Sequence, residues 1–296
     1  MKKLKELIPI LEWLPNYNSS RFKGDFIAGI TVSIILIPQG IAYALIAGLP
    51  PIYGLYCALV PQLVYAIFGS SRQVAIGPVA MDSLIVATGV STLALAGSDS
   101  YIAIAILLAF MVGTIQFLLG VFRLGFIVNF LSKPVISGFT SAVALTIGIN
   151  QFRNLFGVDF VQSDQIQYVL EDIWFTIVDF NFHTTVIGLI SVGVIILLRK
   201  INKKLPNALF VVVVGILTIR HFGDKFFDVA IVKNIPSGLP SFSLPEFDVS
   251  QMKELLPIAL TLVMVGYLET ISIGKSLEAK QDEYKINPNQ ELIALG

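Results

Sequence analysis

Two polar side chains share one face of an apolar stretch near the start of the chain. Gln39 and Tyr43 are four residues apart, so on a helix they lie one turn apart on the same side. Pro38, beside them, removes a backbone donor and distorts the helix about one turn upstream. An amide and a phenol in a membrane helix face protein or water rather than lipid. The pair indicates either a ligand site or a hydrogen bond between helices.

A second feature is a helix start inside another apolar stretch. Gly77 and Pro78 follow the short β-prone run 74–76, and proline at the first helical position is a start signal. A helix that begins inside a protein presents free N–H groups and the positive end of its dipole, which attract anions. Val79 and Ala80 leave the backbone of this tip accessible. The segment predicts a short strand over 74–76 followed by a half-helix that binds an anion, with an ordinary kinked span as the alternative.

Two carboxylic acids lie within the apolar stretches. Asp82, shortly after the helix start, would oppose a bound anion unless it faces away, is protonated or binds a cation. Glu269 lies about one turn from the inner end of the last span, where a carboxylate is costly. It could carry a proton, hold a sodium ion or pair with a cationic side chain. An interfacial side chain that reaches water is the alternative.

The composition limits the class of protein. The 296 residues are 55% hydrophobic and only 14% charged, whereas a soluble domain is about one quarter charged. The chain is therefore expected to be a polytopic membrane protein. Its net charge of zero argues against a nucleic-acid partner. The sequence contains no phosphate-binding loop, nucleophile elbow or metal-spaced His/Cys set, so we expect no enzyme activity, cofactor or metal site.

Eight apolar spans must position these residues. Most approach the ~20 residues needed to cross the hydrocarbon core of a bilayer. They cover about 26–47, 51–69, 74–95, 101–122, 127–150, 183–199, 205–222 and 254–274. The single cysteine, Cys57, falls within the second span, where a role in packing is expected.

The basic residues predict the orientation of these spans. If the N-terminus lies inside and the spans alternate, fifteen of the twenty Lys and Arg residues fall on the inner side. Such a bias follows the positive-inside rule. We therefore expect a multi-pass protein of the cell's inner (plasma) membrane with a cytoplasmic N-terminus.

At this point several ordered motifs resemble the sulfate permease (SulP) family, from about residue 20 to the last residue. The second span carries Pro51-x-Tyr53-Gly54-Leu55-Tyr56, Tyr65 and Gly69-Ser70-Ser71-Arg72. Further matches are Ile37-Pro38-Gln39-Gly40-x-Ala42-Tyr43, Ile76-Gly77-Pro78, Lys133-Pro134-Val135-x-Ser137-Gly138-Phe139 and Asn287-Pro288-Asn289-Gln290-Glu291-Leu292. Several such motifs in order make the resemblance specific.

The resemblance implies a secondary transporter or exchanger of sulfate or a similar inorganic or dicarboxylate anion. It implies an all-α fold of two seven-helix inverted repeats, split into a core and a gate that move in an elevator-like manner. The core would hold helices one to four and eight, and the gate helices five to seven. The anion would bind between the starts of the third and tenth helices. Carried over, the substrate-binding residues are Gln39, Tyr43, Pro78, Val79 and Ala80.

The same resemblance bears on ion coupling and partners. Glu269 matches the acidic position of helix eight. Sodium-coupled bicarbonate members carry an aspartate there and a threonine one turn later, where this chain has Glu269 and Ile273. This difference disfavours sodium and leaves proton coupling or exchange. Family members usually form homodimers, so a homodimer in the lipid bilayer is expected.

The expected organisation has three parts. Residues 1–24 form a cytoplasmic N-terminal segment, and residues 25–283 form the transmembrane domain. Within this domain the first repeat covers about 25–222 and the second begins with 254–283. Residues 284–296 read as the first turns of a further helix, which suggests a longer protein.

Two other functions stay open at this point. One is a nucleobase permease of the same fold, in which the acids of helices eight and ten bind a neutral ring. The other is a non-transporting scaffold or voltage-responsive member. The signature over residues 51–72 favours an anion transporter over the first, and retention of Gln39, Tyr43 and the Gly77-Pro78 opening argues against the second.

Overall fold

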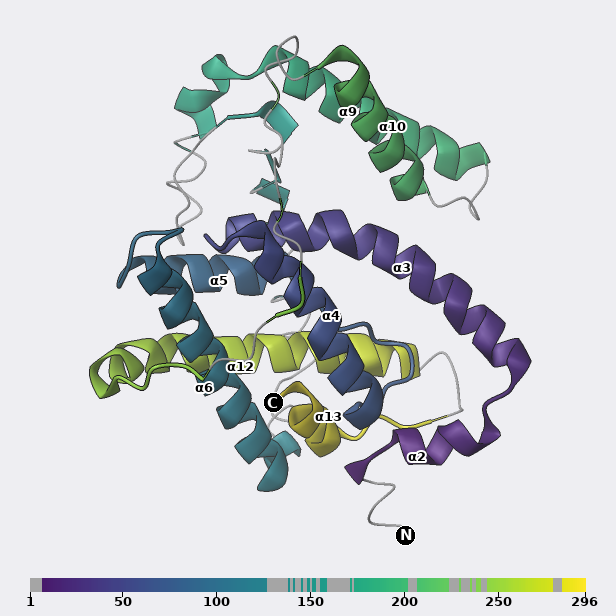
Figure 1. Cartoon of the computed structure of the whole chain (residues 1–296), viewed down its shortest axis with the longest axis vertical. Coiled ribbons are helices and arrows are strands. Elements are labelled where there is room, and N and C mark those ends of the chain that lie inside the picture. The colour runs from purple at the N-terminus through teal and green to yellow at the C-terminus, as the bar shows by residue number, and fades with distance from the viewer. Residues whose placement is uncertain are drawn as a thin grey trace. The chain divides into compact units, whose positions relative to one another are not determined.

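The computed structural model of the chain describes residues 7–126, 173–201, 207–223, 244–278 and 284–296, with short pieces between 138 and 240. These residues form helices and contain no strand (Figure 1). In chain order the elements are α2 (Ile10–Trp13), the 3-10 helix η1 (Leu14–Asn16), α3 (Ser19–Ile46), α4 (Pro51–Phe68), α5 (Ala80–Ser91), α6 (Asp99–Val121), the 3-10 helix η3 (Ile177–Asp179), α9 (Phe182–Ile201), α10 (Asn207–Phe222), α12 (Val249–Glu278) and α13 (Pro288–Leu295).

Five helices of the described residues are long and apolar enough to cross a membrane: α3, α4, α6, α9 and α12. Two shorter apolar helices, α5 and the Phe210–Phe222 part of α10, complete the set. These seven helices fall where seven of the eight spans are expected. The remaining expected span, 127–150, lies almost wholly outside the described residues.

Side-chain caps mark the starts of several described helices, among them α3 and α13. α3 begins after Asn18, whose side chain accepts a hydrogen bond from the backbone N–H of Arg21 at 2.9 Å. α13 begins with Pro288 after Asn287, whose side chain accepts hydrogen bonds from two backbone N–H groups of the first turn. Asparagine caps and first-turn proline both favour a helix start, since they meet or remove N–H groups that lack a partner in the helix.

The chain divides into two compact units, which we describe separately. The first comprises residues 1–29, 36–140 and 237–296, and the second comprises 30–35 and 141–236. In the first unit, α12 packs against α5 and α6, while α13 packs against α4, α6 and α12 (Figure 1). In the second unit, α9 packs against α10.

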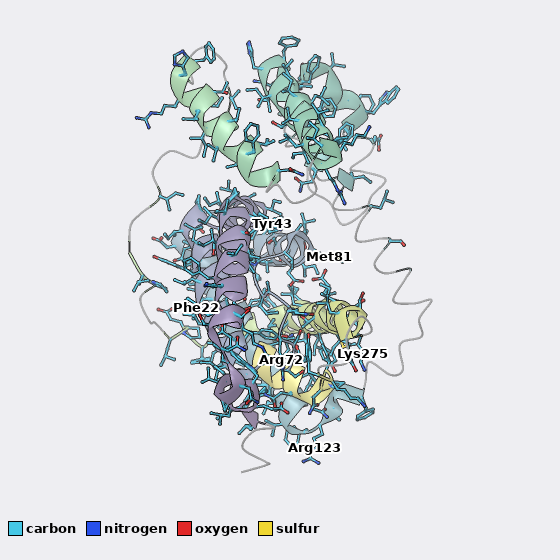
Figure 2. The ribbon with its side chains drawn as sticks, turned by 90° about the vertical axis from the view of Figure 1, so that its right-hand side faces the viewer. Phe22, Tyr43, Arg72, Met81, Arg123 and Lys275 are labelled. Atoms are coloured by element: carbon cyan, nitrogen blue, oxygen red, sulfur yellow. The ribbon has the colours of Figure 1, made fainter. Side chains whose placement is uncertain are left out.

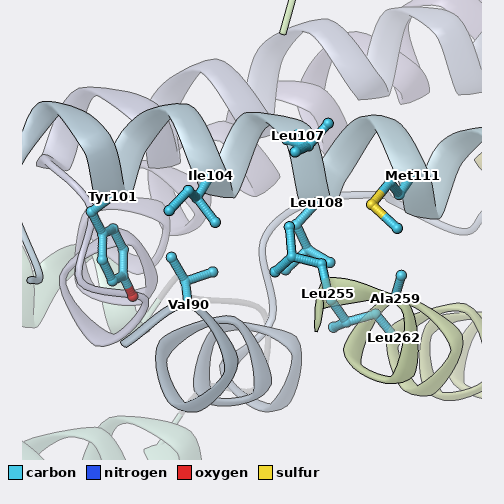
Figure 3. Close-up of a cluster of buried hydrophobic side chains, with 9 residues drawn as sticks. All are labelled: Val90, Tyr101, Ile104, Leu107, Leu108, Met111, Leu255, Ala259 and Leu262. Carbon is cyan, nitrogen blue, oxygen red and sulfur yellow. The ribbon is translucent and has the colours of Figure 1, made fainter. Parts of the chain in front are cut away.

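The core of the first unit is a cluster of buried apolar side chains from α5, α6 and α12 (Figure 3). Val90, Tyr101 and Leu255 in this cluster are completely buried. The hydroxyl of Tyr101 donates a hydrogen bond to the Ala47 carbonyl at 2.7 Å, which ties α6 to the end of α3. Because lipid tails are as apolar as these side chains, close packing rather than transfer from water holds such helices together.

A close backbone contact joins α3 to α4. A Cβ atom added at Gly54 would overlap the carbonyl oxygen of Gly40, and one added at Gly40 would lie 3.0 Å from the carbonyl oxygen of Gly54. Small residues let membrane helices approach closely. This contact therefore requires glycine at position 54 and leaves little room for a side chain at position 40.

The segment before α5 departs from the expectation from sequence. A strand over 74–76 and a helix that begins at Pro78 are expected, but residues 69–79 form neither helix nor strand, and α5 begins at Ala80. A strand needs a neighbouring strand to pair its backbone groups. Here a side chain accepts the backbone hydrogen bond instead: the Ile76 N–H donates to Gln62 Oε1 at 3.2 Å.

The charge count assigns several basic side chains of the first unit to the inner side, among them Arg72, Arg123 and Lys275. Figure 2 shows these three below Tyr43 and Met81. The positive-inside rule expects them on the cytoplasmic side, and this orientation stays a prediction.

The glycine contact can be tested with Gly54→Ala in the full-length protein. The added methyl group should force α3 and α4 apart, at the cost of about 1–3 kcal/mol typical of overpacking. We expect a lower melting temperature in detergent and a lower yield of folded protein. Gly24→Ala on α3 is the control, because no atom lies within 4 Å of the Cβ it would add. Equal melting temperatures for the two variants would contradict the contact.

Candidate functional site

A cavity of about 400 Å³ lies within the first unit. Its size is in the range of small-molecule sites, about 300–1,000 Å³. Residues from α3, α4, α5, α6 and α12 line it, together with segment 74–79. Most of the lining is apolar. Its polar or titratable side chains are Tyr43, Tyr53, Cys57, Asp82, Ser83, Gln116, Glu269 and Thr270.

The start of α5 opens at this cavity. Segment 74–79 leads to it without regular structure, and Gly77, Pro78 and Val79 line the cavity wall. Val79 is the N-cap residue and supplies no side-chain hydrogen bond to the first turn of the helix. The first N–H groups of a helix have no partner within the helix and carry the positive end of its dipole. The cavity therefore has a wall that favours negative charge.

Gln39 and Tyr43 bond to each other rather than to another helix. Gln39 Nε2 donates to the Tyr43 hydroxyl at 3.0 Å, across one turn of α3. Tyr43 lines the cavity, whereas Gln39 is half-buried and absent from the cavity lining. The amide thereby orients the phenol, whose hydroxyl can still donate a hydrogen bond.

Both acids reach the cavity, Asp82 from α5 and Glu269 from α12. Asp82 points toward α12 and α6, since a Cβ added at Gly266 would lie 3.7 Å from Asp82 Oδ2 and 3.8 Å from Gln116 Nε2. Asp82 Oδ1 is buried and has no hydrogen-bond partner among the described residues. A buried ionised carboxylate without a partner is strongly unfavourable. Asp82 is thus a candidate for a proton or a cation.

The structure distributes the expected site residues unevenly. Tyr43, Pro78 and Val79 line the cavity, and Gln39 acts on it through Tyr43. Ala80 is 3% exposed and is not part of the cavity lining. The position of Ala80 follows from the later start of α5, which turns the first helical side chain into the protein.

Gln116 and Cys57 are among the lining residues whose place at the cavity the sequence did not indicate. Gln116 on α6 is a buried polar side chain in an apolar helix, which is a signal that could have found it. Cys57 is expected to be a packing residue, but it is exposed and lines the cavity. The sequence gives no sign that Cys57 borders a cavity, because its neighbours on α4 are apolar and sequence alone does not say which face of a helix borders a cavity.

Comparison with known proteins decides the family. The sequence model of the sulfate permease family matches residues 22–296. The chain belongs to this family.

This sulfate permease family member is similar along almost its whole length to named transporters. It is 41% identical over 300 residues to sulfate transporter 4.1, chloroplastic, of Arabidopsis thaliana, a match covering 98% of the chain and 43% of the relative. It is 34% identical over 330 residues to the sodium-independent sulfate anion transporter of Bos taurus, covering 99% of the chain and 53% of the relative. The chain thus spans about half the length of these relatives.

Two solved structures share its fold. SLC26A9 superposes with a TM-score of 0.86 at 29% identity, over 99% of this chain and 49% of that one. The transmembrane domain of a cyanobacterium bicarbonate transporter, BicA, superposes with a TM-score of 0.79 at 26% identity, over 94% of this chain and 70% of that one. The fold of this family member is therefore that of these membrane proteins.

Cys57 provides a test of the cavity. In the full-length protein in native membranes, a charged, water-soluble methanethiosulfonate reagent should modify Cys57, because the cavity admits water to its thiol. Labelling of Cys57→Ser gives the background from other thiols. The control adds Leu59→Cys to Cys57→Ser, since Leu59 is an exposed residue of α4 that is absent from the cavity lining. We expect lipid to protect position 59. Equal labelling at both positions, or none at Cys57, would contradict an aqueous cavity.

Proposed function

We propose that the protein carrying this chain is a secondary active transporter of sulfate or a similar inorganic or dicarboxylate anion, driven by protons or working as an exchanger. The observation that carries the proposal is the cavity onto which α5 opens with an uncapped first turn. Free N–H groups and the helix dipole bind anions by charge. Family membership and the names of the relatives support sulfate as the first anion to test.

The anion would meet the start of α5 and the hydroxyl of Tyr43. Pro78 and Val79 would let it approach the backbone closely, and Gln39 would hold the phenol in place. Ala80 would contribute through its backbone N–H, because its side chain is buried. Interrupted helices that present their starts to an anion near mid-membrane are a common transporter design.

The two units suggest how transport would proceed. The expected core, helices one to four and eight, corresponds to α3–α6 and α12, which fall in the first unit except for residues 30–35 of α3. The expected gate helices α9 and α10 fall in the second unit. This grouping supports an elevator-like movement of a core that carries the cavity. We also propose a homodimer in the plasma membrane with a cytoplasmic N-terminus.

Glu269 is the proposed coupling group. It shares the cavity with the start of α5, so a proton on Glu269 would reduce the negative charge near a bound anion. Loss of the proton would favour release of the anion by repulsion. Because the carboxyl group and the anion would share one small cavity, binding of the proton and binding of the anion would favour each other.

The proposed function is tested by uptake of radiolabelled sulfate into proteoliposomes containing the full-length protein, with and without an inward proton gradient. Uptake driven by the gradient would support proton symport. Sulfate exchange without a gradient would support an exchanger. Uracil in place of sulfate distinguishes the nucleobase alternative, and transport of neither sulfate nor other inorganic or dicarboxylate anions would contradict the proposal.

Replacing Gln39 or Tyr43 by alanine should weaken apparent sulfate affinity. We expect about a three- to tenfold rise in KM for either variant, the size of one lost hydrogen bond. Their double variant should be little worse than either single variant, because the two side chains form one bonded pair. Thr114→Ala on the exposed face of α6 is the control. An unchanged KM for Tyr43→Ala would remove the pair from the site.

Glu269→Gln should abolish the pH dependence of sulfate uptake in the full-length protein, since an amide cannot exchange the coupling proton. Uptake along a sulfate gradient should remain at a constant rate between acidic and neutral pH. Glu254→Gln is the matched control, because Glu254 is an exposed carboxylate on the same helix and is absent from the cavity lining. If sulfate uptake still depends on pH in Glu269→Gln, Glu269 is excluded as the coupling group.

A further inference from the structure

A buried carboxylate outside the cavity joins two motifs that are more than 200 residues apart. Glu291, in the first turn of α13, is 1% exposed. Its Oε2 accepts a hydrogen bond from the Tyr65 hydroxyl at 2.7 Å. Its Oε1 accepts from the Ser70 N–H at 2.8 Å, the Ser70 hydroxyl at 2.6 Å and the Ser71 N–H at 3.2 Å.

Hydrogen bonds, rather than a basic side chain, meet the charge of this carboxylate. The described residues show no ion pair to Glu291. Hydrogen bonds to an ionised acceptor are shorter and stronger than neutral ones. The start of α13 adds the favourable end of a helix dipole. Removal of Glu291 would therefore leave four donors without an acceptor, two of them backbone N–H groups of an irregular segment.

The segment that Glu291 holds leads directly to the start of α5. Ser71, which is bonded to Glu291, in turn holds the backbone at Val74, because its hydroxyl oxygen accepts the Val74 N–H at 3.2 Å. Gln62 of α4 holds the next part by accepting the Ile76 N–H at 3.2 Å. Residues 74–79 line the cavity. Hydrogen bonds to Glu291, Ser71 and Gln62 thus hold successive parts of the segment up to the proposed anion site.

Other contacts dock α13 independently of Glu291. Asn289 Oδ1 accepts the backbone N–H of Gly125 at 2.8 Å, after the end of α6. Gln290 Nε2 donates to the Phe68 carbonyl at 2.7 Å and to the Leu7 carbonyl at 3.0 Å. None of these bonds involves segment 69–76. Attachment of α13 and control of that segment can therefore be separated by mutation.

We infer that Glu291 is a positioning residue for anion binding: it holds segment 69–76 so that α5 begins at the cavity. The inference rests on the proposed anion site at the start of α5. It assigns a role to the Asn287–Leu292 motif. No residue of this motif lines the cavity, although the nearby Leu295 does. Glu291 acts through Ser70 and Ser71 and does not touch the anion.

The test compares Glu291→Ala with Asn289→Ala in the full-length protein. Both remove a side-chain acceptor from the first turn of α13, Glu291 buried and Asn289 half-buried, but of the two only Glu291 bonds segment 69–76. We expect Glu291→Ala to raise the KM for sulfate about tenfold, as for loss of hydrogen bonds to a charged group, with Vmax per folded transporter nearly unchanged. Asn289→Ala should lower the melting temperature and leave KM within about twofold of wild type. Glu291→Gln, which keeps an acceptor for Ser70 and Ser71, should restore most of the affinity.

A second readout does not depend on transport. Ala75 is exposed and lines the cavity, so Ala75→Cys in a Cys57→Ser background reports on the segment through its rate of labelling by a methanethiosulfonate reagent. Adding Glu291→Ala should speed labelling about threefold or more, because loss of its hydrogen bonds loosens the segment. Adding Asn289→Ala should leave the rate unchanged.

The outcomes separate this inference from the proposed function. Equal KM changes in the two alanine variants, or a labelling rate insensitive to Glu291→Ala, would overturn the positioning role. If wild type transports no anion, the proposed function fails, and with it the link to anion binding. If Glu291→Ala does not fold, Ser71→Ala replaces it. This variant removes the hydroxyl that accepts the Val74 and Gln73 N–H groups and bonds the Tyr284 hydroxyl, and it leaves Glu291 in place. A KM and a labelling rate both unchanged in Ser71→Ala would then overturn the inference.

Discussion

Irregular backbone at membrane depth is tolerated only where it is buried in protein or lines a water-filled cavity, and the first unit is organised around that constraint. Segment 69–79 runs between α4 and α5 with neither helix nor strand. Its N–H groups bond instead to the side chains of Gln62, Ser71 and Glu291. Each of these acceptors comes from a different part of the chain. The start of α5 can lie inside the protein only because these side chains supply what a helix or a sheet would have supplied.

Close packing provides the frame on which this segment rests. Gly40 and Gly54 bring α3 and α4 into backbone contact, and Pro78 lies 3.7 Å from the Cβ position of Gly40. The apolar cluster of α5, α6 and α12 holds the other end of α5 (Figure 3). Because α5 has only 12 residues, about 18 Å of helix, it leaves room for the cavity at its start. A short helix, small residues and an irregular approach together create a site for a small anion.

Sequence patterns predicted most of the helices, and for a clear reason. A membrane-spanning helix satisfies its own backbone, so a long apolar run is enough to predict it. The face shared by Gln39 and Tyr43 was equally predictable, since helical spacing alone sets it. The strand over 74–76 was wrong because β-propensity describes side-chain fit and says nothing about whether a partner strand is present. The start of α5 was displaced by two residues, within the usual uncertainty of helix ends.

The sequence alone determined the membrane class, seven of the helices, the family and the acids and polar residues near the interrupted segments. Each of these depends on local composition, on spacing within one helix, or on ordered motifs. Only the tertiary structure decided that Cys57 and Gln116 line the cavity, that Ala80 does not, and that Glu291 bonds Ser70. These features depend on how helices far apart in sequence meet. Hydrophobic pattern does not encode that geometry, because a helix in a membrane is apolar on its lipid face and its protein face alike.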